Sequence, residues 1–91
     1  MEEKHTHILD TVCQKMMDEL HDIIEDNAFH DKLLEAGLPR EATIIEEIAS
    51  EELTHAKAYR RILTRHGRAI TPEAHELWEK VHEIFHLEEH E

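Results

Sequence analysis

Glu52 and His55 are a carboxylate and an imidazole three residues apart, in a stretch whose apolar residues recur at helical spacing. At 100° per residue, Ile48 and Tyr59 lie within about 40° of Glu52 around the helix axis, and His55 lies about 60° away. A carboxylate on an apolar face loses its solvation on folding, and burying it unpaired costs several kcal/mol. We therefore expect a cation or a proton at Glu52, or a buried salt-linked pair with His55.

Further carboxylates lie beside an earlier apolar stripe that includes Leu20 and Ile23. Glu19 is about 40° from Ile23 around the helix axis, and Asp26 falls on the same edge. Asp22 lies farther round, where we expect a solvated side chain. Two stretches of the chain thus carry polar groups on the side that should face the core.

Three helices are expected to position these residues. Gly37 and Gly67 suit the left-handed residue that ends a helix, and Pro39 suits a first helical turn. Thr71-Pro72-Glu73 combines a capping hydroxyl, a proline and an acid at a helix start. Because the chain has only two glycines and two prolines, the sequence predicts an all-α fold. The expected helices span residues 3–36, 39–66 and 72–88 of a single domain, 1–91.

The first two helices should form a long antiparallel hairpin, with the short third helix beside it. One hairpin cannot bury both its apolar stripe and its polar groups, even with the third helix packed against it. We therefore expect homodimerisation to complete a four-helix bundle.

Charge and hydropathy exclude several classes of partner. The net charge of −12 argues against nucleic acid and anionic membrane surfaces, and favours the attraction of cations. The apolar runs are too short for a transmembrane span or a signal-peptide core. Cys13 is the single cysteine and cannot form an internal disulfide, which is typical of a buried thiol in a cytoplasmic protein.

Histidines form a stripe along the expected third helix, and Glu79 and Glu83 lie alongside it. Its members are His75, His82, His86 and His90. The apolar residues of this helix, such as Trp78 and Val81, fall on the opposite face. The stripe is therefore either a solvated face or an interface, and His82 with His86 is a candidate secondary metal site.

The stretch from Glu19 to Leu63 resembles the first helical hairpin of rubrerythrin and ferritin-like proteins. The match consists of a Glu on the first helix, Gly37 at the turn, and Ala49-Ser50-Glu51-Glu52-Leu53-Thr54-His55-Ala56 on the second helix. A ferritin-like protein has four such helices in one chain, whereas this chain has half of them. The half size is similar to that of encapsulated ferritins.

The resemblance implies a di-iron centre (Fe²⁺/Fe³⁺) on the dimer axis. Glu52 would bridge the two metals, His55 would be a terminal ligand, and Glu19 would be the carboxylate ligand from the first helix. The spacing in encapsulated ferritins falls nearer to Asp22, so Asp22 is the alternative to Glu19. The implied function is a ferroxidase that oxidises Fe(II) with oxygen or peroxide, in iron storage or detoxification. The same ligands bind Zn or Mn, and the alternative is a non-enzymatic helical dimer fastened by zinc.

The resemblance also implies higher assembly. Storage by a half-size chain would need a ring of dimers or a partner shell of the encapsulin type. Encapsulated ferritins usually carry a C-terminal docking peptide for their shell, and residues 86–91 show no such peptide. This difference counts against delivery into a shell.

Overall fold

The computed structural model describes residues 2–86, and the side chains from Thr6 onward. All the secondary structure of this range is helical: α1 (Glu2–Glu35), α2 (Pro39–Arg65) and α3 (Pro72–Phe85). The predicted all-α class is confirmed. α3 ends earlier than the predicted residue 88, because His86 adopts a left-handed conformation with φ of 56°. Residues 87–88 of that prediction, and His90, lie outside the described residues.

Two glycines end the long helices. Gly37 has φ of 78° and Gly67 has φ of 65°, a backbone conformation that side chains with a Cβ rarely adopt. After α1, the Leu38 N–H donates to the Leu33 carbonyl at 2.9 Å, and after α2 the Arg68 N–H donates to the Leu63 carbonyl at 2.9 Å. These bonds satisfy carbonyl groups at the two helix ends and fix the turns that follow.

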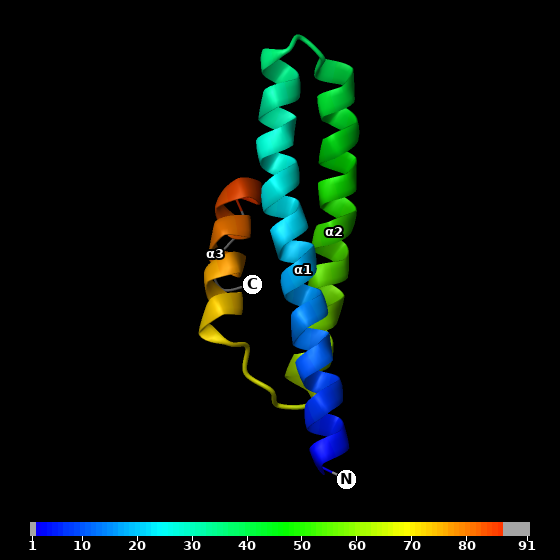
Figure 1. Cartoon of the computed structure of the whole chain (residues 1–91), viewed down its shortest axis with the longest axis vertical. Helices are drawn as coiled ribbons and strands as arrows, with labels where there is room; N and C mark the ends of the chain where they lie inside the picture. Colours follow the sequence, from blue (N-terminus) through cyan, green and yellow to red (C-terminus); the bar gives the residue numbers. More distant parts are fainter. Residues whose placement is uncertain (1, 87–91) are drawn as a thin grey trace.

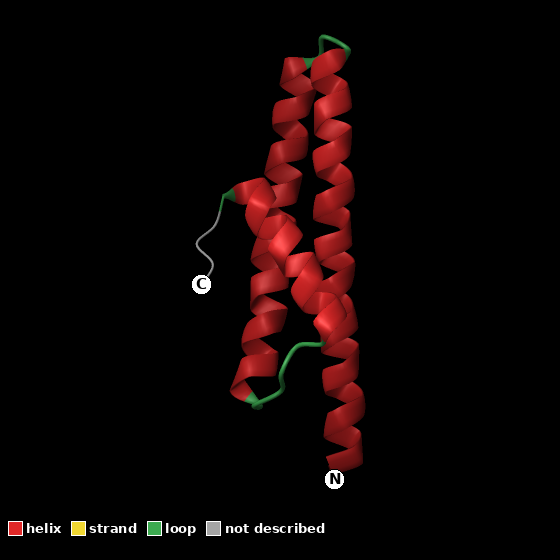
Figure 2. Cartoon of the chain, turned by 90° about the vertical axis from the view of Figure 1, so that its left-hand side faces the viewer, coloured by secondary structure: helices red, strands yellow, loops and turns green. Residues whose placement is uncertain are grey.

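α1 and α2 run antiparallel as a long hairpin, and α3 lies diagonally across one face of it (Figures 1 and 2). α3 starts at Thr71, whose hydroxyl accepts the Ala74 N–H at 3.1 Å. Trp78 is buried and donates from Nε1 to Met16 Sδ at 3.3 Å. The largest fully buried side chains of the core come from all three helices: Met16, Leu20, Ile23, Leu63 and Val81. The core therefore lies between the hairpin and α3.

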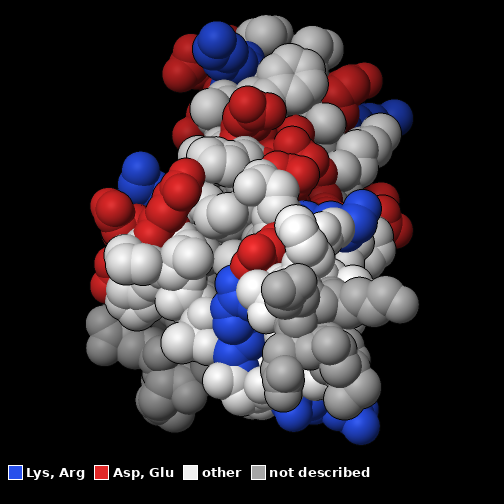
Figure 3. All heavy atoms as spheres, turned by 60° about the horizontal axis from the view of Figure 1, so that its bottom comes forward, with Lys and Arg blue, Asp and Glu red and all other residues white. Residues whose placement is uncertain are grey.

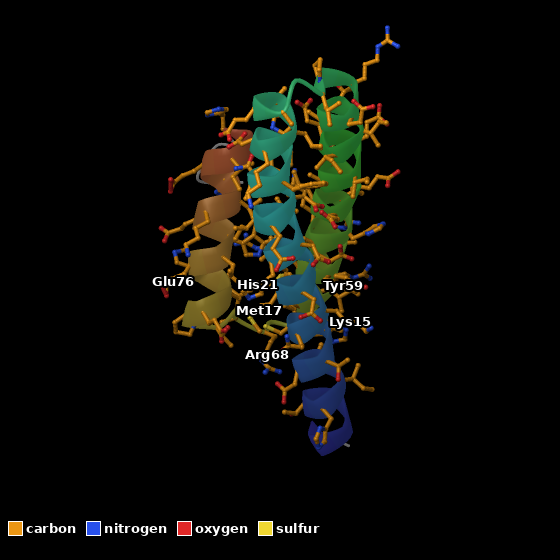
Figure 4. All side chains as sticks on the ribbon, turned by 45° about the horizontal axis from the view of Figure 1, so that its top comes forward. Lys15, Met17, His21, Tyr59, Arg68 and Glu76 are labelled. Atoms are coloured by element: carbon orange, nitrogen blue, oxygen red, sulfur yellow. The ribbon has the colours of Figure 1, made fainter. Side chains whose placement is uncertain are left out.

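The face of the hairpin that points away from α3 is open. Figure 4 shows Tyr59 and Lys15 on that side and Met17 and His21 on the side nearer α3. Large apolar side chains remain exposed on α2, with Ile44 at 54%, Ile48 at 40% and Ile62 at 40%. Their spacing places them on the same side of α2 as His55. We call this surface of α1 and α2 the open face. No described helix is long and apolar enough to cross a membrane.

Candidate metal centre

Three carboxylates from α1 and α2 converge halfway along the hairpin. Glu19 and Asp22 lie one turn apart on α1, and Glu52 faces them from α2. One oxygen from each lies within 4.8 Å of the other two. Glu19 and Glu52 are half-buried and Asp22 is exposed. The structure thus places both Glu19 and its alternative Asp22 beside Glu52, although helical phase alone favoured Glu19.

The carboxyl group of Glu52 is in an unusual electrostatic environment. Burial raises its pKa to about 8, and the hydrogen bond with Asp26 and the negative charges of Asp26, Asp22 and Glu19 add to the increase. Glu52 Oε1 is buried and has no hydrogen-bond partner among the described residues. An unsatisfied buried oxygen costs about 1–3 kcal/mol. A bound cation next to Oε1 would remove this cost and the repulsion from the neighbouring acids.

His55 lies next to this trio and is oriented by it. Its Nδ1 is 3.3 Å from Glu19 Oε2, and its side chain is 61% exposed. His55 is therefore within reach of the same metal as Glu19, but it lies outside the 4.8 Å cluster. Together the four side chains offer carboxylate oxygens and one imidazole, a set that binds Fe²⁺, Mn²⁺ and Zn²⁺.

A second polar pair joins the helices nearer the hairpin turn. His30 Nε2 is 2.7 Å from Glu46 Oε2, and His30 Nδ1 is 3.2 Å from Asp31 Oδ1. The hydrogen bonds to Asp31 and Glu46 raise the pKa of His30. The pairing of His30 with Glu46 was not among the contacts predicted from the sequence. The antiparallel pairing of Glu19 with His55 could have revealed it, since stepping along both helices from that pair brings these residues together.

The histidine stripe on α3 differs in part from the expectation. His82 is half-buried and its ring contacts Trp78 edge-on, with ring centroids 5.8 Å apart. His75 is exposed, with Nε2 3.7 Å from Glu79 Oε2. Within residues 6–86, no three potential ligand atoms gather on α3 as they do at Glu52. The pair of His82 and His86 as a secondary metal site therefore stays a prediction.

No protein-family model matches the chain, and neither a curated protein nor a solved structure matches it significantly. The ferritin-like assignment thus rests on the residues of the hairpin and their geometry, and it stays a prediction.

Proposed function

We propose that two copies of the chain pair through their open faces, and that the resulting four-helix bundle binds two metal ions between them. The observation that carries this proposal is Glu52 Oε1, a buried oxygen without a partner that lies among Glu19 and Asp22. In one chain this arrangement is unfavourable, because like charges crowd a poorly solvated group. Cations between two such clusters would neutralise both.

The open face supports the same pairing. Ile48 and Ile44 lie one and two turns before Glu52 on α2, and Ile62 lies beyond it. These side chains are 40–54% exposed in the single chain. Large apolar side chains that are exposed along one helix face favour an interaction site there. A second hairpin would cover these residues and exclude water from the carboxylates.

The function that this site supports best is oxidation of Fe(II) to Fe(III), in iron storage or detoxification. Glu52 would bridge the two ions, Glu19 or Asp22 would bind from α1, and His55 would supply one nitrogen to each ion. Iron is the substrate here: each Fe(II) gives one electron to oxygen or peroxide. The carboxylates would contribute by stabilising the added positive charge, and the net charge of −12 would attract Fe²⁺.

The test is anaerobic addition of Fe(II) to metal-free protein, followed by air. We expect rapid ferric absorbance with about two irons per two chains, and its loss in Glu52→Ala. Glu51→Ala is the matched control, since Glu51 is the exposed neighbour of Glu52. Tight binding of zinc and iron that fastens a dimer, without accelerated oxidation, would contradict the ferroxidase and favour the zinc-fastened dimer.

A further inference from the structure

A groove between the second half of α2 and α3 is cationic, although the chain as a whole is acidic. Its volume is about 670 Å³. No described Asp or Glu lines it, whereas the sequence contains 22 acids and only ten Lys and Arg. The charged and aromatic side chains of its wall are Lys57, Arg60, Arg61, Arg65, Trp78 and His82. We call it the basic groove.

The charges of the basic groove are not neutralised within the chain. None of its four Lys and Arg side chains forms an ion pair with a described carboxylate, whereas nearby Arg68 pairs with Asp10. Figure 3 shows Lys and Arg gathered at the near end of the molecule, whereas most Asp and Glu lie farther along, with a few Lys and Arg among them. An acidic chain that concentrates unpaired cations in one hollow has a surface suited to an anion.

The helix dipole explains only part of this concentration. Arg65 lies in the last turn of α2, where a cation is favourable. Lys57 and Arg60 lie one to two turns earlier, where that effect has largely decayed. The Arg60 guanidinium lies over the Trp78 ring, 5.1 Å from its centroid. This stacking fixes its direction and leaves its N–H groups free to donate.

We propose that the basic groove binds a multivalent oxyanion of the phosphate type. Planar guanidinium groups donate paired hydrogen bonds to phosphate oxygens, and the groove presents three of them together with Lys57. Trp78 is only 3% exposed and is already contacted by Arg60 and His82. It therefore offers no free ring face to a nucleobase, and the recognised chemistry is the phosphate group itself.

This site is independent of the proposed metal centre. It also accounts for His82, which was a candidate for cation capture in the sequence analysis. His82 separates the basic groove, where Lys and Arg side chains would repel a metal cation, from a second hollow lined by His75, Glu79 and Glu83. A ring N–H of His82 is a further donor to an anion on the groove side.

The experiment is a titration of the full chain with inorganic phosphate at pH 7, with chloride at matched ionic strength as the reference. The backbone and side-chain N–H signals of Arg61 and Arg65, which line the groove, report on it in ¹H–¹⁵N spectra. We expect saturable shifts with phosphate and none with chloride. In Arg61→Gln/Arg65→Gln, affinity should fall at least about tenfold, because two charge-assisted contacts are lost.

The matched control is Lys32→Gln/Arg40→Gln, which also removes two positive charges, but from exposed positions near the α1–α2 turn. It should retain the wild-type affinity. Equal weakening in both double variants, or no saturable shift in the wild type, would overturn the proposal. Methyl phosphate distinguishes the source: equal binding supports recognition of a phosphate ester, and weaker binding supports free phosphate.

Discussion

His55 of α2 and Glu19 of α1 are joined across the hairpin, with Nδ1 and Oε2 3.3 Å apart. This contact keeps Glu19 beside Glu52, although both carboxyl groups are acidic and Asp22 is close to them. Because the His55 side chain is 61% exposed, its ring has room to turn from Glu19 toward a bound cation. The contact thus positions the polar cluster in the metal-free chain.

Substitutions on α1 should separate the two candidate ligands. We expect Glu19→Gln and Asp22→Asn each to weaken Fe²⁺ or Mn²⁺ binding at least tenfold, about 1.4 kcal/mol, because both carboxylates lie within 4.8 Å of Glu52. Isothermal titration under anaerobic conditions measures this. Asp18→Asn is the control, since Asp18 is exposed and accepts a hydrogen bond from Gln14 instead. If only one of the two substitutions weakens binding, that residue alone is the α1 ligand.

The raised pKa of Glu52 sets a pH dependence for the metal-free protein. Its folded pKa of about 8 lies above its ordinary value of 4.5, so the folded state binds more protons between these values. Stability from this group is therefore greatest below pH 4.5 and falls as pH rises toward 8. Urea unfolding with chelator at pH 5, 7 and 9 should show Glu52→Gln gaining stability relative to wild type as pH increases. A constant difference would contradict this prediction.

Metal binding should release a proton from the same group. At pH 7 the carboxyl of Glu52 is largely protonated, because its pKa is about 8, and a ligating carboxylate has to be deprotonated. We expect release of close to one proton per chain on loading at pH 7, and much less at pH 9. An indicator dye in weak buffer measures the release. The pH 7 signal should be absent in Glu52→Gln, and its persistence there would assign the proton to another group.

Association should depend on the open face. Ile48→Asp places a charge beside Glu52 and should prevent pairing, while folding is kept because Ile48 is 40% exposed. Leu34→Asp is the matched control: Leu34 is 49% exposed but lies about 120° round α1 from Asp22. Sedimentation with and without Fe²⁺ should show a metal-dependent dimer for wild type and Leu34→Asp only. Dimerisation of Ile48→Asp would contradict pairing through this face.

The fold was predictable because its signals are local. Gly37, Gly67 and Thr71 act within one or two turns of the chain, so the sequence indicates where each helix begins or ends. The observed end of α3 differs from the predicted one because His86 is left-handed. A left-handed residue is usually glycine or asparagine, so the sequence did not indicate it. Periodicity also placed Glu52 and Glu19 on facing stripes.

The rest of the polar geometry depends on how the helices cross. Asp22 was expected to be solvated, and it is exposed, yet its carboxylate still reaches Glu52. The basic groove was not predictable because Arg60 and Trp78 are far apart in the sequence and meet only when α3 crosses the hairpin. Helical periodicity predicts the face of a helix on which a residue lies. It does not predict which residues of two helices meet, because that depends on how far one helix is shifted along the other.

Native mass spectrometry of the iron-loaded protein shows whether two chains share a pair of metal ions. Metal-free protein is loaded with Fe²⁺ without oxygen, alongside Glu52→Ala, His55→Ala and the Glu51→Ala control. We predict two chains with about two irons for wild type and control, and metal-poor monomers for Glu52→Ala and His55→Ala, whose helix content by circular dichroism is unchanged. A wild-type monomer that carries its full iron, or unchanged loading in Glu52→Ala, would contradict this prediction.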